Sequence, residues 1–222
     1  MRLDHRHLDP LVPTERPPMV ILLHGYGANM DDLLALGHAL DPRLRVVSAQ
    51  APVDLSIHGA PGGRAWFNLF MTPSGIDFDR DEASEAVEAA SSFVTEAAET
   101  YAHDPAQLHV LGFSQGAMMA HAMVLARSVP ITGAMACSGR MIESLFEAKT
   151  DTDDLEGFPI LVTHGSLDEV IPISSGRAIR DWYAETPAEL TWGEYEMGHG
   201  IGPECMADLQ GWMRGRLGPP AG

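Results

Sequence analysis

Residues 108–127 read LHVLGFSQGAMMAHAMVLAR, and this stretch decides the fold. An apolar run that predicts a strand over 108–112 leads into Gly112-Phe113-Ser114-Gln115-Gly116, and a helix is expected over 115–127. A G-x-S-x-G pattern between a strand and a helix is typical of a nucleophile elbow, a sharp turn that exposes a serine hydroxyl. Ser114 is therefore the candidate nucleophile, at a helix N-terminus whose N–H groups favour an oxyanion.

Short apolar runs alternate with longer segments of helical periodicity on both sides of this stretch. Strands are expected at 19–23, 44–49, 131–137, 159–163 and 189–196, with a short edge strand within 3–8. Helices are expected at 31–40, 81–103, 174–185 and 204–217. This alternation predicts an α/β fold with a mostly parallel central sheet and helices on both faces. Without a linker, a repeat or a long lid segment, a single domain over 1–222 with no large cap domain is expected.

One connection, residues 50–78, does not fit the alternation and is rich in glycine, proline and aromatic residues. Connections longer than about 12–15 residues are usually functional or disordered, and the apolar content here argues against disorder. We expect this connection to form a substrate-binding wall beside a cleft, made by Trp66, Phe67, Leu69, Phe70 and Met71.

The order of catalytic residues in such a fold is serine, then an acid, then histidine. His164 and His199 both follow Ser114, and His199 is favoured as the base because it lies in a loop after the expected strand 189–196. Asp168 follows the expected strand 159–163 and is the preferred acid, with Glu169 as its nearest rival. Its role would be to fix the imidazole tautomer and to stabilise the imidazolium.

Two backbone N–H groups are the candidate oxyanion hole, those of Tyr26 and Gln115. Tyr26 lies in the loop directly after the expected strand 19–23. Met118 on the helix after Ser114 is either core packing or part of the acyl pocket. Val170 and Ile171 closely follow the candidate acid and are expected to line one side of the cleft.

The composition narrows the function classes. Fourteen basic and 31 acidic residues give a net charge of −17, which should repel nucleic acid and anionic lipid. Plain solubility and adaptation to high salt both explain such a charge.

Cys137 and Cys205 are expected to be free, mostly buried thiols. The beginning of the sequence does not resemble a signal peptide and no apolar run could span a bilayer, so a cytoplasmic location is expected. His5 and His7 have no third ligand nearby in sequence, so no metal site is expected.

Four blocks of the sequence together resemble the bacterial phospholipase/carboxylesterase family of α/β-hydrolases, which includes the acyl-protein thioesterases. They are LLHGYGANMDDLL, GFSQGAMMA, HGSLDEVIP and MGHG, in this order and spacing within about 17–215. The resemblance implies a triad of Ser114, Asp168 and His199 and an oxyanion hole from Tyr26 and Gln115. It also implies hydrolysis of carboxylic esters or thioesters without a metal or organic cofactor. Tyr26 stands where many relatives carry leucine.

The sequence therefore predicts a serine carboxylesterase that acts on small esters with short-to-medium acyl chains, as a monomer or homodimer. One alternative is a lysophospholipase or acyl-protein thioesterase that takes long acyl chains. The alternative from another class is a non-catalytic binding protein on a hydrolase fold.

Overall fold

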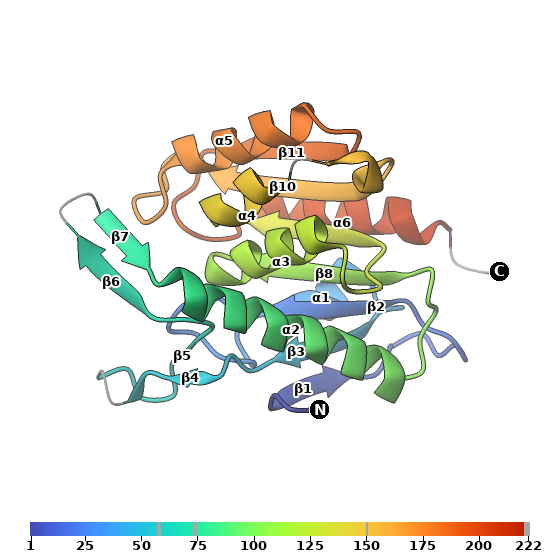
Figure 1. The fold of residues 1–222 in the computed structure, drawn as a ribbon. Helices are drawn as coiled ribbons and strands as arrows, with labels where there is room; N and C mark the ends of the chain where they lie inside the picture. The colour runs from blue at the N-terminus through green and yellow to red at the C-terminus, as the bar shows by residue number, and fades with distance from the viewer. Residues whose placement is uncertain (57–58, 73–74, 150, 220–222) are drawn as a thin grey trace.

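Seven strands form one sheet through the middle of the molecule (Figure 1). The computed structural model describes residues 1–56, 59–72, 75–149 and 151–219. The strands, in their spatial order, are β1 (His5–Leu8), β3 (Arg45–Ala49), β2 (Met19–Leu23), β8 (Leu108–Phe113), β9 (Gly133–Cys137), β10 (Pro159–Gly165) and β11 (Glu189–Tyr195). The edge strand β1 runs antiparallel to β3, and every other neighbouring pair is parallel. The expected mostly parallel sheet is confirmed.

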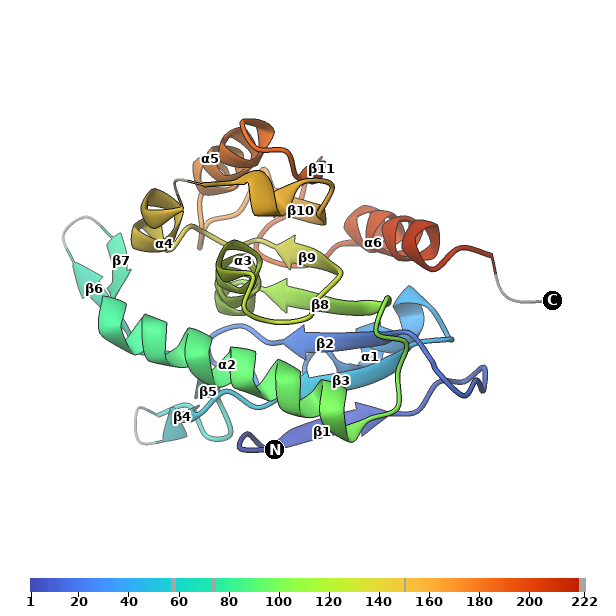
Figure 2. The same ribbon diagram turned by 45° about the vertical axis from the view of Figure 1, so that its right-hand side comes forward.

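Helices cover both faces of this sheet, as expected (Figure 2). One face carries α2 (Arg80–Thr100), α3 (Gln115–Ala126), α4 (Glu143–Ala148) and α5 (Ile173–Ala184), and the other carries α1 (Leu34–Leu40) and α6 (Pro203–Leu217). Each face has its own cluster of buried apolar side chains. Helix α3 is buried along nearly its whole length because α2, α4 and the sheet surround it. The helix that begins directly after Ser114 is thus among the most enclosed elements of the fold.

The parallel register brings the carboxyl ends of the central strands together. Leu23 of β2 lies opposite Gly112 of β8, and Phe113 lies opposite Cys137 of β9. Loops that leave these ends therefore meet at one edge of the sheet, where α/β proteins form their sites. Within the described residues, no separate cap domain lies over this edge.

Several boundaries differ from the sequence expectation. The helix expected at 31–40 begins only at Leu34, because Asn29 accepts the Asp31 N–H in a turn that precedes it. Helix α2 begins earlier than expected, at Arg80, because the Asp79 carboxylate accepts the N–H groups of the first turn. The short helix α4 and a 3₁₀ turn over Asp153–Leu155 were not expected.

The connection 50–78 contains regular structure. Its strands are β4 (Val53–Asp54), β5 (Arg64–Ala65), β6 (Leu69–Thr72) and β7 (Gly75–Phe78), paired as β4–β5 and β6–β7. Residues 57–58 and 73–74 of the connection lie outside the described residues. The β6–β7 hairpin projects from the carboxyl edge of the sheet, beyond the N-terminal end of α2 (Figure 1).

Both cysteines are free and buried, as the sequence indicated. Among the helices of the described residues, none combines the length and the apolar character needed to cross a lipid bilayer. His5 and His7 each lie within hydrogen-bond distance of the Tyr101 hydroxyl, at 2.9 and 3.2 Å.

Candidate active site

Ser114 lies on the turn between β8 and α3 in a backbone conformation that non-glycine residues rarely adopt. Its φ is 55° and its ψ is −115°. Its N–H donates to the carbonyl of Cys137 at 2.9 Å, which ties the turn to the neighbouring strand. Such strain persists only where the surrounding structure enforces it, and it is common at active sites. The turn is the elbow that the sequence predicted.

The glycines on either side of Ser114 explain how the turn is enforced. A Cβ at Gly112 would overlap the carbonyl of Gly116, and a Cβ at Gly116 would overlap the carbonyl of Leu23 in β2. The first turn of α3 is therefore packed directly against backbone, with no space for a side chain. The spacing of the motif is a packing requirement of the strand–turn–helix unit.

A chain of hydrogen bonds links Ser114 to two side chains from other loops. The Ser114 Oγ lies 2.9 Å from His199 Nε2, and His199 Nδ1 lies 2.7 Å from Asp168 Oδ2. His199 follows β11, Asp168 follows β10, and the Phe113 ring packs against the imidazole at 5.0 Å between centroids. In this arrangement Nε2 can take the serine proton while Nδ1–H remains bonded to the carboxylate.

Asp168 is held so that it presents one oxygen to His199. Its side chain is fully buried, and its Oδ1 accepts the N–H groups of Val170 and Ile171 at 2.9 and 2.8 Å. These two bonds leave Oδ2 for the histidine. Glu169, the alternative acid, instead lies on the wall of the cavity that surrounds Ser114.

The loop after β2 lies directly beside the elbow. A Cβ at Gly25 would be 3.3 Å from Ser114 Cβ, and Gly27 N–H donates to the Arg64 carbonyl at 2.8 Å. Burial lowers the pKa of His24, whose Nδ1 bonds the Gly25 carbonyl while its Nε2 accepts the Ala51 N–H. Within the described chain, the N–H groups of Tyr26 and Gln115 have no hydrogen-bond acceptor. Both residues line the same cavity as Ser114.

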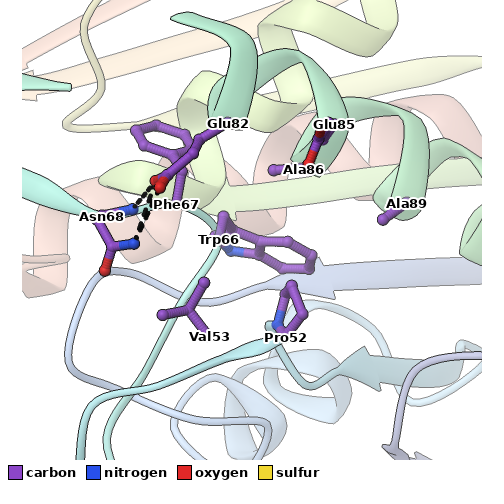
Figure 3. Close-up of a pocket in the computed structure, with 9 residues that line it drawn as sticks. All are labelled: Pro52, Val53, Trp66, Phe67, Asn68, Glu82, Glu85, Ala86 and Ala89. Atoms are coloured by element: carbon purple, nitrogen blue, oxygen red, sulfur yellow. Dashed lines mark hydrogen bonds between the residues drawn. The ribbon is translucent and has the colours of Figure 1, made fainter. Parts of the chain in front are cut away.

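Trp66 and Phe67 are not part of the cleft wall, which corrects the sequence expectation. Both are buried, and they line a separate cavity of about 330 Å³ between residues 52–53 and α2 (Figure 3). The Gln115 amide accepts the Trp66 N–H at 2.9 Å and donates to the Phe67 carbonyl at 2.8 Å. The Trp66 indole donates to the His24 carbonyl at 2.9 Å. Through these hydrogen bonds, the two aromatic residues stabilise the elbow and the loop after β2. Their large rings pack into the core and do not line the cavity around Ser114.

Ser114 and His199 open onto a cavity of about 720 Å³ with mostly apolar walls. The other residues expected to bind substrate all line it, from three elements: Leu69, Phe70 and Met71 on the hairpin, Met118 on α3, and Val170 and Ile171 after Asp168. Its volume is in the range of small-molecule sites. The Tyr26 side chain also lines this cavity.

Some lining residues were missed at the level of sequence. They are Ile76, Phe78, Arg140, Pro172 and Ser175. Pro73-Ser74-Gly75 is a turn signal, and the alternation Ile76-Asp77-Phe78 after it is typical of a hairpin strand that could have identified Ile76 and Phe78. No sequence signal indicated the structural bonds of the Gln115 amide. His121, which also follows Ser114 in the chain, is buried in α3 and lies 3.2 Å from the Tyr183 hydroxyl, outside this cavity.

The mostly parallel sheet and the serine elbow at its carboxyl edge define the class of protein, a hydrolase with the α/β-hydrolase fold. The sequence pattern of the phospholipase/carboxylesterase family matches residues 13–215, and the chain belongs to that family. It is therefore an enzyme of the serine hydrolase class.

Individual relatives agree with this assignment. The crystal structure of esterase PE8 matches with a TM-score of 0.82 and 28% identity, covering 98% of this chain and 100% of that one. Acyl-protein thioesterase 1 of Saccharomyces cerevisiae is 26% identical over 212 residues, which are 89% of this chain and 92% of that protein. A probable carboxylesterase SOBER1-like of Arabidopsis thaliana is 25% identical over 156 residues, which are 69% of this chain and 59% of that protein.

Proposed function

We propose that Ser114, His199 and Asp168 form a catalytic triad and that the enzyme hydrolyses carboxylic esters with short-to-medium acyl chains. The observation that carries the proposal is the chain of two hydrogen bonds from Ser114 Oγ through His199 to the buried Asp168. A serine hydroxyl is a weak nucleophile until a base removes its proton, and this chain provides that base.

The reaction follows from the positions of these groups. Ser114 Oγ attacks the ester carbonyl carbon as His199 Nε2 takes its proton, and the N–H groups of Tyr26 and Gln115 bind the resulting oxyanion. Collapse of the tetrahedral intermediate breaks the bond to the alcohol, which leaves with the proton from His199. Water then attacks the acyl-enzyme with His199 as base, releasing the acid and restoring the Ser114 hydroxyl.

The acyl-chain preference rests on the cavity walls. Leu69, Met118 and Ile171 contribute apolar surface to the cavity that Ser114 also lines. Apolar surface of this kind binds methylene groups at about 0.8 kcal/mol each. The small substrate that we propose fits a cavity of about 720 Å³.

A second candidate, a lysophospholipase or acyl-protein thioesterase, is favoured by one observation. The hairpin exposes apolar side chains beside the cavity, with Met71 77% exposed and Phe70 49% exposed. Such surface could extend the binding of a long acyl chain. The net charge of −17 opposes approach to anionic bilayers.

Hydrolysis of p-nitrophenyl esters from acetate to palmitate, by the native enzyme and by Ser114→Ala, tests the proposal. We expect a maximum at short-to-medium chains and a loss of ~10⁴–10⁶ in kcat for Ser114→Ala. Ser91→Ala is the matched control, because the Ser91 hydroxyl is buried in α2 without a hydrogen-bond partner among the described residues.

Each outcome decides between the candidates. A steep rise in kcat/KM from butyrate to palmitate would favour the long-chain alternative. Unchanged rates in Ser114→Ala would contradict the serine mechanism. A native protein inactive on every ester would overturn the proposed substrate class.

A further inference from the structure

Asp168 has a second histidine beside it, His164 at the end of β10. The His164 side chain is 1% exposed, and its Nε2 lies 2.8 Å from the Ile171 carbonyl and 3.4 Å from Asp168 Oδ2. His164 does not line the cavity that holds Ser114 and His199. The reaction proposed above gives this histidine no role.

The contacts of His164 fix which nitrogen donates. A carbonyl oxygen can only accept a hydrogen bond, so Nε2 carries a proton. Nδ1 is buried and has no hydrogen-bond partner in the described parts of the chain. Helix α5 closes that side of the ring, since a Cβ at Gly176 would lie 2.6 Å from Nδ1. The ring is therefore held as a donor that points toward the loop 168–171.

Ile171 connects this donor to the triad acid. Its carbonyl accepts from His164, while its N–H donates to Asp168 Oδ1 at 2.8 Å. Ile171 is thus held through both its carbonyl and its N–H. The Asp168 carboxylate cannot rotate without breaking its bond to that N–H. The second oxygen then faces His199 at 2.7 Å.

We propose that His164 is a positioning residue for the reaction: its Nε2–H holds the loop 168–171 so that Asp168 presents Oδ2 to His199. This inference rests on the proposed function, because it assigns His164 a role only through the Asp168–His199 pair. The loss of this donor lowers the rate of the chemical step and leaves substrate binding largely intact.

Two amide substitutions separate the donor from the space that the ring fills. The amide nitrogen of glutamine in His164→Gln reaches about the position of Nε2, whereas the shorter side chain in His164→Asn reaches only that of Nδ1. We expect His164→Asn to lower kcat about 10–100-fold on p-nitrophenyl butyrate with KM changed by less than about 3-fold, and His164→Gln to retain most of kcat. Equal losses in both variants, or a change in KM alone, would overturn the proposal.

A double-mutant cycle shows whether the effect passes through Asp168. In an Asp168→Asn background, His164→Asn should cause a further loss of less than about 2-fold, because the group that it positions is already absent. Full multiplication of the two losses would contradict the inference and indicate a separate structural role.

Gly176→Ala is a second test, to be used if His164→Asn does not fold. Its added Cβ displaces the His164 ring from the α5 side and removes no polar group. It should lower kcat with little change in KM, and an unchanged kcat in a folded variant would count against the inference. Ser114→Ala in the same assay keeps the two proposals distinct. If Ser114→Ala abolishes hydrolysis and the His164 variants keep the native kcat, only the inference about His164 fails.

Discussion

The two sides of the cavity around Ser114 are built in different ways. On the elbow side, Gln115 and Asp168 are buried, and each is held by two hydrogen bonds to backbone groups. On the hairpin side, Phe70, Met71 and Ile76 are apolar and exposed. The elbow side is packed into the sheet and α3, whereas the hairpin projects from the body of the fold (Figures 1 and 2).

This difference matches the roles that we propose for the two sides, proton transfer on the elbow side and acyl-chain binding on the hairpin side. Proton transfer needs donor and acceptor within hydrogen-bond distance, and a displacement of about 1 Å can cost ~10²-fold in rate. Buried and fully bonded side chains provide that accuracy. Binding an acyl chain needs only apolar area, which is not directional. The hairpin side can therefore change in sequence without disturbing the chemistry.

The largest effect is expected from the elbow side, in Gly116→Ala. The added Cβ would overlap the Leu23 carbonyl, which belongs to a central strand and cannot move away. We expect kcat/KM to fall at least ~10²-fold for every ester, and the free energy of unfolding to fall by about 1–3 kcal/mol. Ester hydrolysis and chemical denaturation measure the two quantities.

Gly211→Ala in α6 is the matched control, because a Cβ there meets no atom within 4 Å. Alanine is favoured over glycine in helices, so this variant should be more stable by about 0.5–1 kcal/mol, with native activity. Equal behaviour of the two variants would show that the close approach at Gly116 does not matter.

The elbow side was largely predictable from sequence. The motif around Ser114 and the chain order led to Asp168 and His199, and the structure brings these residues into one hydrogen-bonded chain. Local patterns suffice here because the elbow is built from one strand–turn–helix unit and because loops after parallel strands meet at one edge. The parallel sheet was predictable for the same reason.

The connection 50–78 was the least predictable part. From the sequence, Trp66 and Phe67 are expected in a binding wall. In the structure they are buried in the core, and their backbone groups are hydrogen-bonded to the Gln115 amide. Only tertiary packing decides whether an aromatic ring in a long connection faces a cleft or the core. Chain order offers His164 only as an alternative base, and its contacts with Ile171 and Asp168 depend on the tertiary structure.

An intermediate effect, limited to longer esters, is expected from Phe70→Ser on the hairpin. Phe70 lines the cavity but is 49% exposed, so its loss removes apolar contact with the acyl chain and little of the core. We expect kcat/KM for the octanoate to fall about 5–30-fold, equivalent to about 1–2 kcal/mol of lost apolar burial, with the acetate nearly unchanged. The ratio of the two kcat/KM values is the measurement.

Leu11→Ser controls for a general effect of exposed apolar residues, since Leu11 is 66% exposed and does not line the cavity. Its octanoate-to-acetate ratio should equal the native one. An equal drop for both esters in Phe70→Ser would mean that the hairpin supports the chemistry, and the contrast between the two sides would be wrong.

The smallest effect is expected where the two sides are joined, at Arg140. Its guanidinium donates to the Ile76 carbonyl of the hairpin and to Glu143 of α4, both at 2.9 Å, and lies over the Phe78 ring at 5.3 Å. In Arg140→Met the hairpin loses this polar attachment, at a cost of about 0.5–1.5 kcal/mol. We expect KM for the octanoate to rise about 2–5-fold while kcat for the acetate stays native.

Glu143→Gln is the control for this variant. It keeps the bond between Arg140 and the Ile76 carbonyl and removes only a partly exposed ion pair, so its KM should change by less than about 2-fold. A fall in acetate kcat in Arg140→Met would show that motion of the hairpin reaches Ser114, and the two sides would then act as one unit.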